Sequence, residues 1–194
     1  QQQTEVLGFD TEKQYYVLAG EEQNFVFTPQ HTGYYNVNLS NGENVTTLLN
    51  NTVVTQDTEL KLNAGTQYNI KIKASESATS YGNISVSPKV LDNSSQISLE
   101  SGEEQIVKLG IIGATIKNAA LTNSNCKFLS IKKSLNQVLV DDITFTTATN
   151  EFGNLFTSNS YYAVLKNFAD NAVTTSISFT DPTTISDNSM VHVT

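Results

Sequence analysis

A short motif occurs twice in the chain, and this repeat constrains the fold more than any other feature. Residues 20–23 and residues 102–105 both read Gly-Glu-Glu-Gln, about 82 positions apart, and each precedes a largely apolar stretch. A repeat of this length is too long for a solenoid unit and suits a small domain. We therefore expect two tandem copies of one module, with boundaries at residues 1–88 and 89–194.

Alternation of apolar and polar residues predicts β-strands along most of the chain. Residues 35–39, 68–72 and 83–87 alternate clearly, and turn-forming Gly, Asn or Pro residues lie at their ends. Such half-buried strands are typical of antiparallel sheets with one face in water. The expected fold is all-β: two tandem antiparallel β-sandwiches of the jelly-roll or Ig-like type.

The second copy follows the same plan with more divergence. Tyr162 and Val164 are expected to match Tyr68 and Ile70. The segment 159–168 has a short helix as its alternative, but Tyr and Val favour the pleated surface of a sheet. We therefore predict a strand there.

The boundary between the copies is short and contains no glycine. Residues 89–95 include apolar Val90 and Leu91, which predicts that the chain passes directly into a strand. A connection of this kind allows little movement between the copies. The segment 106–112 is so rich in apolar residues that we expect it to be covered on both faces.

Composition and charge limit the partners. The net charge is -8 and the pI about 4.6, which argues against nucleic acids and anionic membrane surfaces. No apolar run is long enough to span a membrane. Cys126 is the single cysteine, so no intrachain disulfide can form. The absence of a starting Met and of a signal peptide suggests a processed or excised piece, and we expect an extracellular or cell-surface monomer.

Residues typical of catalysis are scarce. His31 and His192 lie in no nucleophile or metal motif, and Cys126 precedes a predicted strand, where a free cysteine is usually a buried apolar residue. We therefore expect no enzyme activity.

Calcium is the one cofactor that the acidic residues suggest, because it binds carboxylate and carbonyl oxygens in loops. The alternative is that these charges lie at turns and sheet edges, where they deter aggregation. The candidate ligands are Glu21, Glu22, Asp141, Asp142 and Glu151.

Tyrosine is the best candidate for ligand binding, because the chain has no Trp. Three adjacent tyrosine pairs occur, and one member of each pair should face outward from its strand. Tyr16, Tyr34 and Tyr161 are the predicted outward members, and a platform of such rings suits a sugar or protein surface. The alternative is ordinary pairing between neighbouring strands.

The first copy resembles the bacterial pre-peptidase C-terminal domain, the jelly-roll family that includes clostridial collagen-binding domains. Asn-Phe-Val-Phe-Thr-Pro at 24–29, Thr-Gly-Tyr-Tyr-Asn-Val at 32–37 and Leu-Asn-Ala-Gly-Thr-Gln-Tyr-Asn-Ile at 62–70 carry the resemblance, which covers residues 15–88. It implies a secreted, non-catalytic appendage that helps an enzyme or adhesin to engage a surface.

Together these features predict a non-catalytic bacterial module, secreted or on the cell surface, that acts as a spacer or adhesion element. The alternative is a carbohydrate- or protein-binding accessory module of a secreted enzyme. In either case the expected partner is an extracellular glycan or protein.

Overall fold

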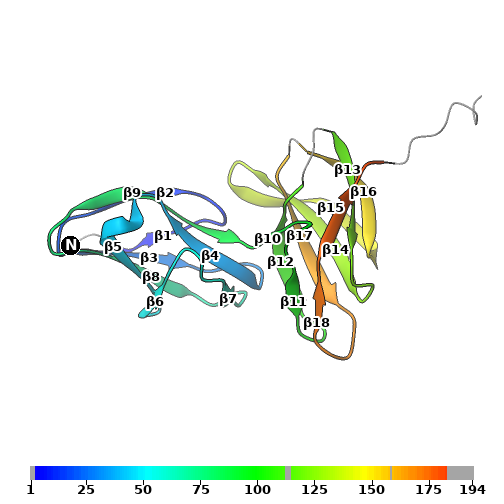
Figure 1. The fold of residues 1–194 in the computed structure, drawn as a ribbon, viewed down its shortest axis with the longest axis horizontal. Helices are drawn as coiled ribbons and strands as arrows, with labels where there is room; N and C mark the ends of the chain where they lie inside the picture. Colours follow the sequence, from blue (N-terminus) through cyan, green and yellow to red (C-terminus); the bar gives the residue numbers. More distant parts are fainter. Residues whose placement is uncertain (1–2, 112–114, 158, 183–194) are drawn as a thin grey trace, which may run out of the picture.

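The computed structural model describes residues 3–111, 115–157 and 159–182, and it is almost entirely β-strand (Figure 1). We call residues 3–88 the first half and residues 89–182 the second half. Within the described ranges, the single helical element is the 3-10 turn η1 (Gly42–Asn44).

In the first half, strands far apart in sequence pair in a nested order. The strands are β1 (Glu5–Val6), β2 (Lys13–Val17), β3 (Glu22–Phe27), β4 (Gly33–Leu39), β5 (Val45–Leu49), β6 (Thr52–Val54), β7 (Leu60–Leu62), β8 (Tyr68–Ala74) and β9 (Ser80–Pro88). β2 pairs with β9, β3 with β8, β4 with β7 and β5 with β6, all antiparallel. This wrapping is that of a jelly roll, and its two sheets have the orders β1-β3-β8-β5-β6 and β2-β9-β4-β7.

The second half repeats this order. Its strands are β10 (Val90–Leu91), β11 (Ile97–Leu99), β12 (Glu104–Leu109), β13 (Ile116–Leu121), β14 (Cys126–Leu135), β15 (Val138–Thr149), β16 (Glu151–Phe156), β17 (Tyr161–Asn167), β18 (Val173–Thr175) and β19 (Ile177–Thr180). β11 pairs with β18, β12 with β17, β13 with β16 and β14 with β15. β19 pairs with β13 as β9 pairs with β4. The predicted all-β sandwich fold is confirmed, while independent folding of residues 1–88 and 89–194 stays a prediction.

The repeated Gly-Glu-Glu-Gln motif is a turn that begins the same strand in each half. Gly20 and Gly102 have φ values of 74° and 73°, a left-handed conformation that glycine adopts without strain. The amide of Glu21 donates to the carbonyl of Leu18 at 2.9 Å, and that of Glu103 donates to Glu100 at 3.1 Å. β3 and β12 start directly after these turns.

The glutamine of the motif connects the strand that follows the turn, β3 or β12, to a strand of the facing sheet. Gln23 and Gln105 are buried. Gln23 Oε1 accepts from the backbone amide of Tyr16 in β2 at 3.2 Å, and Gln105 Nε2 donates to the carbonyl of Ser98 in β11 at 2.9 Å. Both side chains thus bond the backbone of an edge strand, which lowers its tendency to pair with other chains.

One pairing in each half departs from the antiparallel plan. β1 pairs with β3, and β10 with β12, in parallel register. Each of these added strands has two residues, too few for any periodicity. β10 is the strand predicted from apolar Val90 and Leu91, whereas the sequence pattern gives no sign of β1.

The strand predicted within 159–168 is present as β17, but its match to the first half was wrong by one residue. The hydroxyl of Tyr68 accepts from the amide of Asn63 at 2.8 Å, and the hydroxyl of Tyr161 accepts from the amide of Phe156 at 3.2 Å. Tyr161, and not Tyr162, therefore occupies the place of Tyr68. A shift of one residue in a strand exchanges its two faces.

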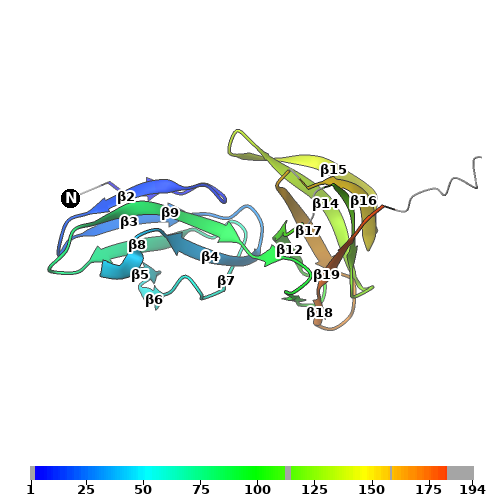
Figure 2. The same ribbon diagram turned by 45° about the horizontal axis from the view of Figure 1, so that its top comes forward.

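The two halves lie side by side, and their strands run in different directions (Figures 1 and 2). The sheet that contains β12 and β17 faces the first half, with β12 packing on β4 and β9. The sheet that contains β13, β16 and β19 lies on the side away from it (Figures 1 and 2).

Candidate functional site

The junction between the halves has an apolar centre. Ile106 of β12 and Tyr162 and Val164 of β17 are buried in the same cluster as the core of the first half. The ring centroids of Phe9 and Tyr162 are 5.0 Å apart in an edge-to-face arrangement. The prediction that strand 106–112 is covered on both faces is confirmed for its described part, because Ile106 and Val107 are both fully buried.

A polar contact lies beside this apolar centre. The Asp10 carboxylate is 3.0 Å from Lys108 Nζ, and it accepts a hydrogen bond from the Tyr162 hydroxyl. Burial, together with the hydrogen bond to Asp10, raises the pKa of Tyr162 well above its ordinary value. The phenol therefore stays protonated and keeps its bond to the carboxylate.

A second ion pair crosses the junction. Lys61 Nζ lies 2.6 Å from the Glu103 carboxylate and 5.8 Å from the ring centroid of Tyr34. Burial alone would raise the pKa of Glu103, but hydrogen bonds from Lys61 and Gln105 outweigh it, so this pKa is lowered. Glu103 thus remains charged and paired with the other half.

The backbones of the two halves also touch. The Ile106 amide donates to the carbonyl of Thr32 at 2.8 Å. A Cβ at Gly33 would lie 2.8 Å from the Ile106 carbonyl oxygen, so only glycine allows this approach. A single residue, Lys89, separates β9 from β10, and its amide donates to Tyr34 at 2.7 Å. The predicted direct passage into a strand is confirmed.

The predicted tyrosine platform does not form as expected. Tyr16 is 55% exposed, but Tyr161 is 2% exposed, so its predicted outward orientation is wrong. The reason is the one-residue shift in β17, which turns Tyr161 into the core of the second half and Tyr162 toward the first half. Tyr34 lies half-buried at the junction, against the core cluster of the second half.

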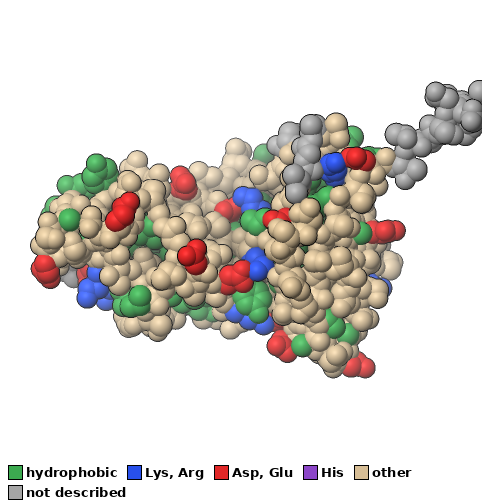
Figure 3. Space-filling view, in the orientation of Figure 1, with side chains coloured by type: hydrophobic (Ala, Val, Ile, Leu, Met, Phe, Trp, Pro, Cys, Tyr) green, Lys and Arg blue, Asp and Glu red, His purple; other side chains and the backbone are tan. Residues whose placement is uncertain are grey.

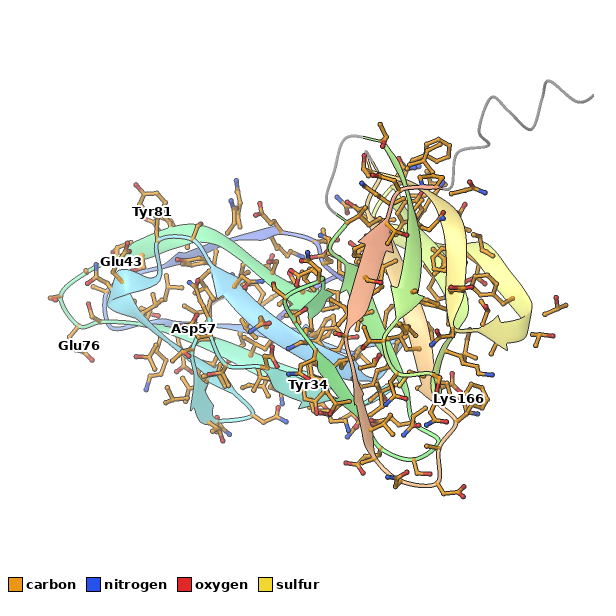
Figure 4. All side chains as sticks on the ribbon, turned by 45° about the vertical axis from the view of Figure 1, so that its right-hand side comes forward. Tyr34, Glu43, Asp57, Glu76, Tyr81 and Lys166 are labelled. Carbon is orange, nitrogen blue, oxygen red and sulfur yellow. The ribbon has the colours of Figure 1, made fainter. Side chains whose placement is uncertain are left out.

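Tyr81, which sequence reasoning missed, lies opposite Tyr16 instead. The two residues are register partners on β9 and β2, and their ring centroids are 6.2 Å apart with 25° between the planes. Tyr81 is 63% exposed and projects from the first half, far from Lys166 of the second half (Figure 4). The sequence Ser-Tyr-Gly around Tyr81 does not predict this contact, because the contact depends on the pairing of β2 with β9.

The predicted calcium ligands lie on separate elements and mostly contact lysines. Glu21 lies in the turn before β3, and Glu22 is the first residue of β3. Asp141 and Asp142 lie in β15, and Glu151 is the first residue of β16. Glu22 pairs with Lys71, Asp142 with Lys133 at 3.3 Å, and Asp141 with Lys132, whose hydrogen bond lowers the pKa of Asp141. Across residues 3–111, 115–157 and 159–182, no group of three or more acidic, histidine or cysteine residues is placed to hold a metal ion.

Two further residues with reactive side chains, Cys126 and His31, lie in the described part of the chain. Cys126 is fully buried, and burial raises the pKa of its thiol to about 11. His31 is half-buried near the β14–β15 hairpin, and burial and then Lys132 lower its pKa. His192 lies outside the described residues. No helix in the described part of the chain is long and apolar enough to cross a membrane.

The visible surface carries few clusters of charge (Figure 3). Uncharged polar side chains and backbone cover most of it, and acidic and basic side chains gather mainly near the junction between the halves. This surface gives no extended basic face on the side shown, which agrees with the low content of charged residues.

No protein-family model matches the chain, and no curated protein matches it in sequence. Among solved structures, the CUB1-EGF-CUB2 region of human MASP-1/3 is similar over 87% of this chain and 99% of its own, with 8% identity and a TM-score of 0.24. A turret protein of Sulfolobus turreted icosahedral virus has 13% identity and a TM-score of 0.22 over 87% of this chain and 95% of its own. A blue copper oxidase from Nitrosomonas europaea has 9% identity and a TM-score of 0.22 over 89% and 75%.

Proposed function

We propose that the chain is a non-catalytic extracellular or cell-surface module that acts as a spacer or adhesion element. The observation that carries this proposal is the packed junction. A spacer has to hold its two ends at a defined separation, and here bending would expose Ile106 and Tyr162, which are buried between the halves. Exposure of such side chains costs roughly 2 kcal/mol each, so the bent forms are rare.

The polar contacts at the junction favour one relative orientation of the two halves. Asp10 binds Lys108 and Tyr162, and Lys61 binds Glu103, so charges on each half meet a partner on the other. Hydrogen bonds to charged groups have defined geometry and contribute about 1.5–3 kcal/mol when partly buried. They favour one relative orientation over others with equal apolar burial.

The placement of the strands suits a load-bearing element. β12 and β17 face the first half, and β19 lies on the opposite side of the second half (Figure 2). Tension applied between β1 and β19 therefore crosses the junction. The low charge content and the lack of paired cysteines agree with a bacterial surface module, which often lacks disulfides.

Distances between spin labels on the two halves test this proposal. Labels at exposed Asn44→Cys and Asp170→Cys, in a Cys126→Ala background, should give one narrow distance distribution. Gly33→Ala should broaden it, because the added Cβ meets the Ile106 carbonyl at 2.8 Å. Gly8→Ala is the matched control, since its Cβ would approach only Thr11, at 3.5 Å. A distribution in the unmodified sequence as broad as that of a flexible linker would contradict a rigid spacer.

A further inference from the structure

The exposed pair Tyr16–Tyr81 borders a concave surface on the first half. This depression has a volume of about 1190 Å³, and residues of β1, β2, β9 and the loop after β4 line it. Ligand sites are usually concave, with volumes of roughly 300–1,000 Å³, and combine apolar rings with a few polar groups. The depression is somewhat larger than that range and is shallow, which suits an extended ligand over a compact one.

The rim of the depression is fixed before any ligand arrives. A Cβ at Gly82 would lie 2.5 Å from the Ser40 carbonyl oxygen, so glycine is needed for the loop at Ser40 and Asn41 to pack closely against β9. The amide of Asn83 donates to Ser40 Oγ at 2.8 Å, and Asn41 Nδ2 donates to the Tyr81 carbonyl at 3.3 Å. From below, the buried Tyr15 donates its hydroxyl to Ser40 at 2.5 Å. A preorganised rim saves the entropy of ordering a loop on binding.

The chemistry of the rim favours an uncharged ligand. Its charged side chains are Glu5, Glu12 and Lys13, and Lys13 Nζ lies 3.9 Å from Glu5, so these charges partly offset one another. The other polar lining groups are amides and hydroxyls, including Gln14 and Asn83. Such groups both donate and accept hydrogen bonds, as the hydroxyls of a sugar require.

We propose that this depression binds a neutral oligosaccharide. Tyr16 and Tyr81 present near-parallel rings at 6.2 Å, on which the apolar face of a pyranose ring packs. The amides of Gln14, Asn41 and Asn83 and the Glu12 carboxylate bond its hydroxyls. A protein partner would instead require a centre that is fully removed from water, which a shallow surface with an even mixture of polar and apolar groups does not provide.

This site is independent of the junction, because it lies on the first half away from β12 and β17. Loss of saccharide binding would leave the spacer geometry unchanged, and a flexible junction would leave the saccharide site unchanged. The two proposals therefore fail separately.

Titration of the full chain with neutral hexasaccharides, followed by NMR of the tyrosine rings, tests the proposal. The probes are cellohexaose, chitohexaose, mannohexaose and maltohexaose. At least one should shift the Tyr16 and Tyr81 ring resonances in a saturable way. Tyr81→Ala and Tyr16→Ala should each weaken that binding at least about tenfold, whereas Tyr81→Phe, which keeps the ring, should stay within about threefold.

Phe156→Ala provides the matched control, because Phe156 is a similarly exposed ring on the second half, 52% accessible. Its affinity should equal that of the unmodified chain. Absence of ring shifts with all four sugars would overturn the proposal, as would undiminished binding by folded Tyr16→Ala and Tyr81→Ala. Shifts at these rings with a collagen-like peptide, but with none of the sugars, would also overturn it and indicate a protein ligand.

Discussion

The first half and the second half share a strand order, but the outward faces of the corresponding strands β3 and β12 have different surroundings. β3 alternates between buried and partly exposed residues, whereas its counterpart β12 has three successive buried residues, Gln105, Ile106 and Val107. Asn24 in β3 corresponds to Ile106 in β12. The repeat thus preserves the inward face of the strand, while the outward face changes from a wet surface to an interface.

The sharpest test of this difference replaces a buried residue of β12 by the residue that β3 carries at the corresponding position. Ile106→Asn places in β12 the residue that β3 carries, and it buries an amide where no water reaches. We expect a loss of about 3–5 kcal/mol in the free energy of unfolding, measured by urea denaturation. Asn24→Ser, at the partly exposed counterpart, should change it by less than about 0.5 kcal/mol. Equal losses of unfolding free energy in the two variants would mean that burial of Ile106 at the junction adds nothing to stability.

An intermediate effect is expected at a pair of corresponding aspartates. Asp10 binds Lys108 and Tyr162 across the junction, whereas Asp92 bonds with Ser94 and Ser95 of its own turn. Asp10→Asn should lower the free energy of unfolding by about 1–3 kcal/mol, because a half-buried lysine loses its partner. Asp92→Asn should cost less than about 1 kcal/mol. Thermal melting of both variants measures the two losses of stability. An equal or larger loss for Asp92→Asn would contradict a stabilising role of Asp10 at the junction.

The smallest expected effect is on the pH dependence of stability, through His31. Burial, and then Lys132, lower its pKa in the folded chain, while Asp141 and Glu104 act in the opposite direction. The folded state therefore binds fewer protons than the unfolded state, so stability is complete above pH about 6.5 and declines as the pH falls below it. The decline should be less than about 1 kcal/mol after solvent screening. Melting temperatures of His31→Gln between pH 5 and 8 should lack this component; an unchanged profile would contradict the assignment.

Periodicity and turn residues were sufficient to predict the sandwich and most strands. They failed at Tyr161, because a strand of five successive buried residues has no alternation from which its register can be read. Tyr81 was missed for a different reason: its role depends on pairing with β2, which is more than sixty residues away in sequence. The two-residue parallel strand β1 leaves no pattern at all. Local spacing thus predicts elements, whereas a site made by distant strands needs their register.

The nested pairing of the strands also has a consequence for synthesis. Because β2 pairs with β9 and β3 with β8, the first sandwich is complete only when its last strand has left the ribosome. Contacts between residues far apart in sequence make folding slow, and domains made first usually fold first. A first half that folds before the second would offer Phe9, whose ring contacts Tyr162, to the apolar outer faces of β12 and β17 as they emerge. The order of the two copies along the chain would then allow early covering of the apolar outer faces of β12 and β17, and exchanging that order should lower the yield of folded protein.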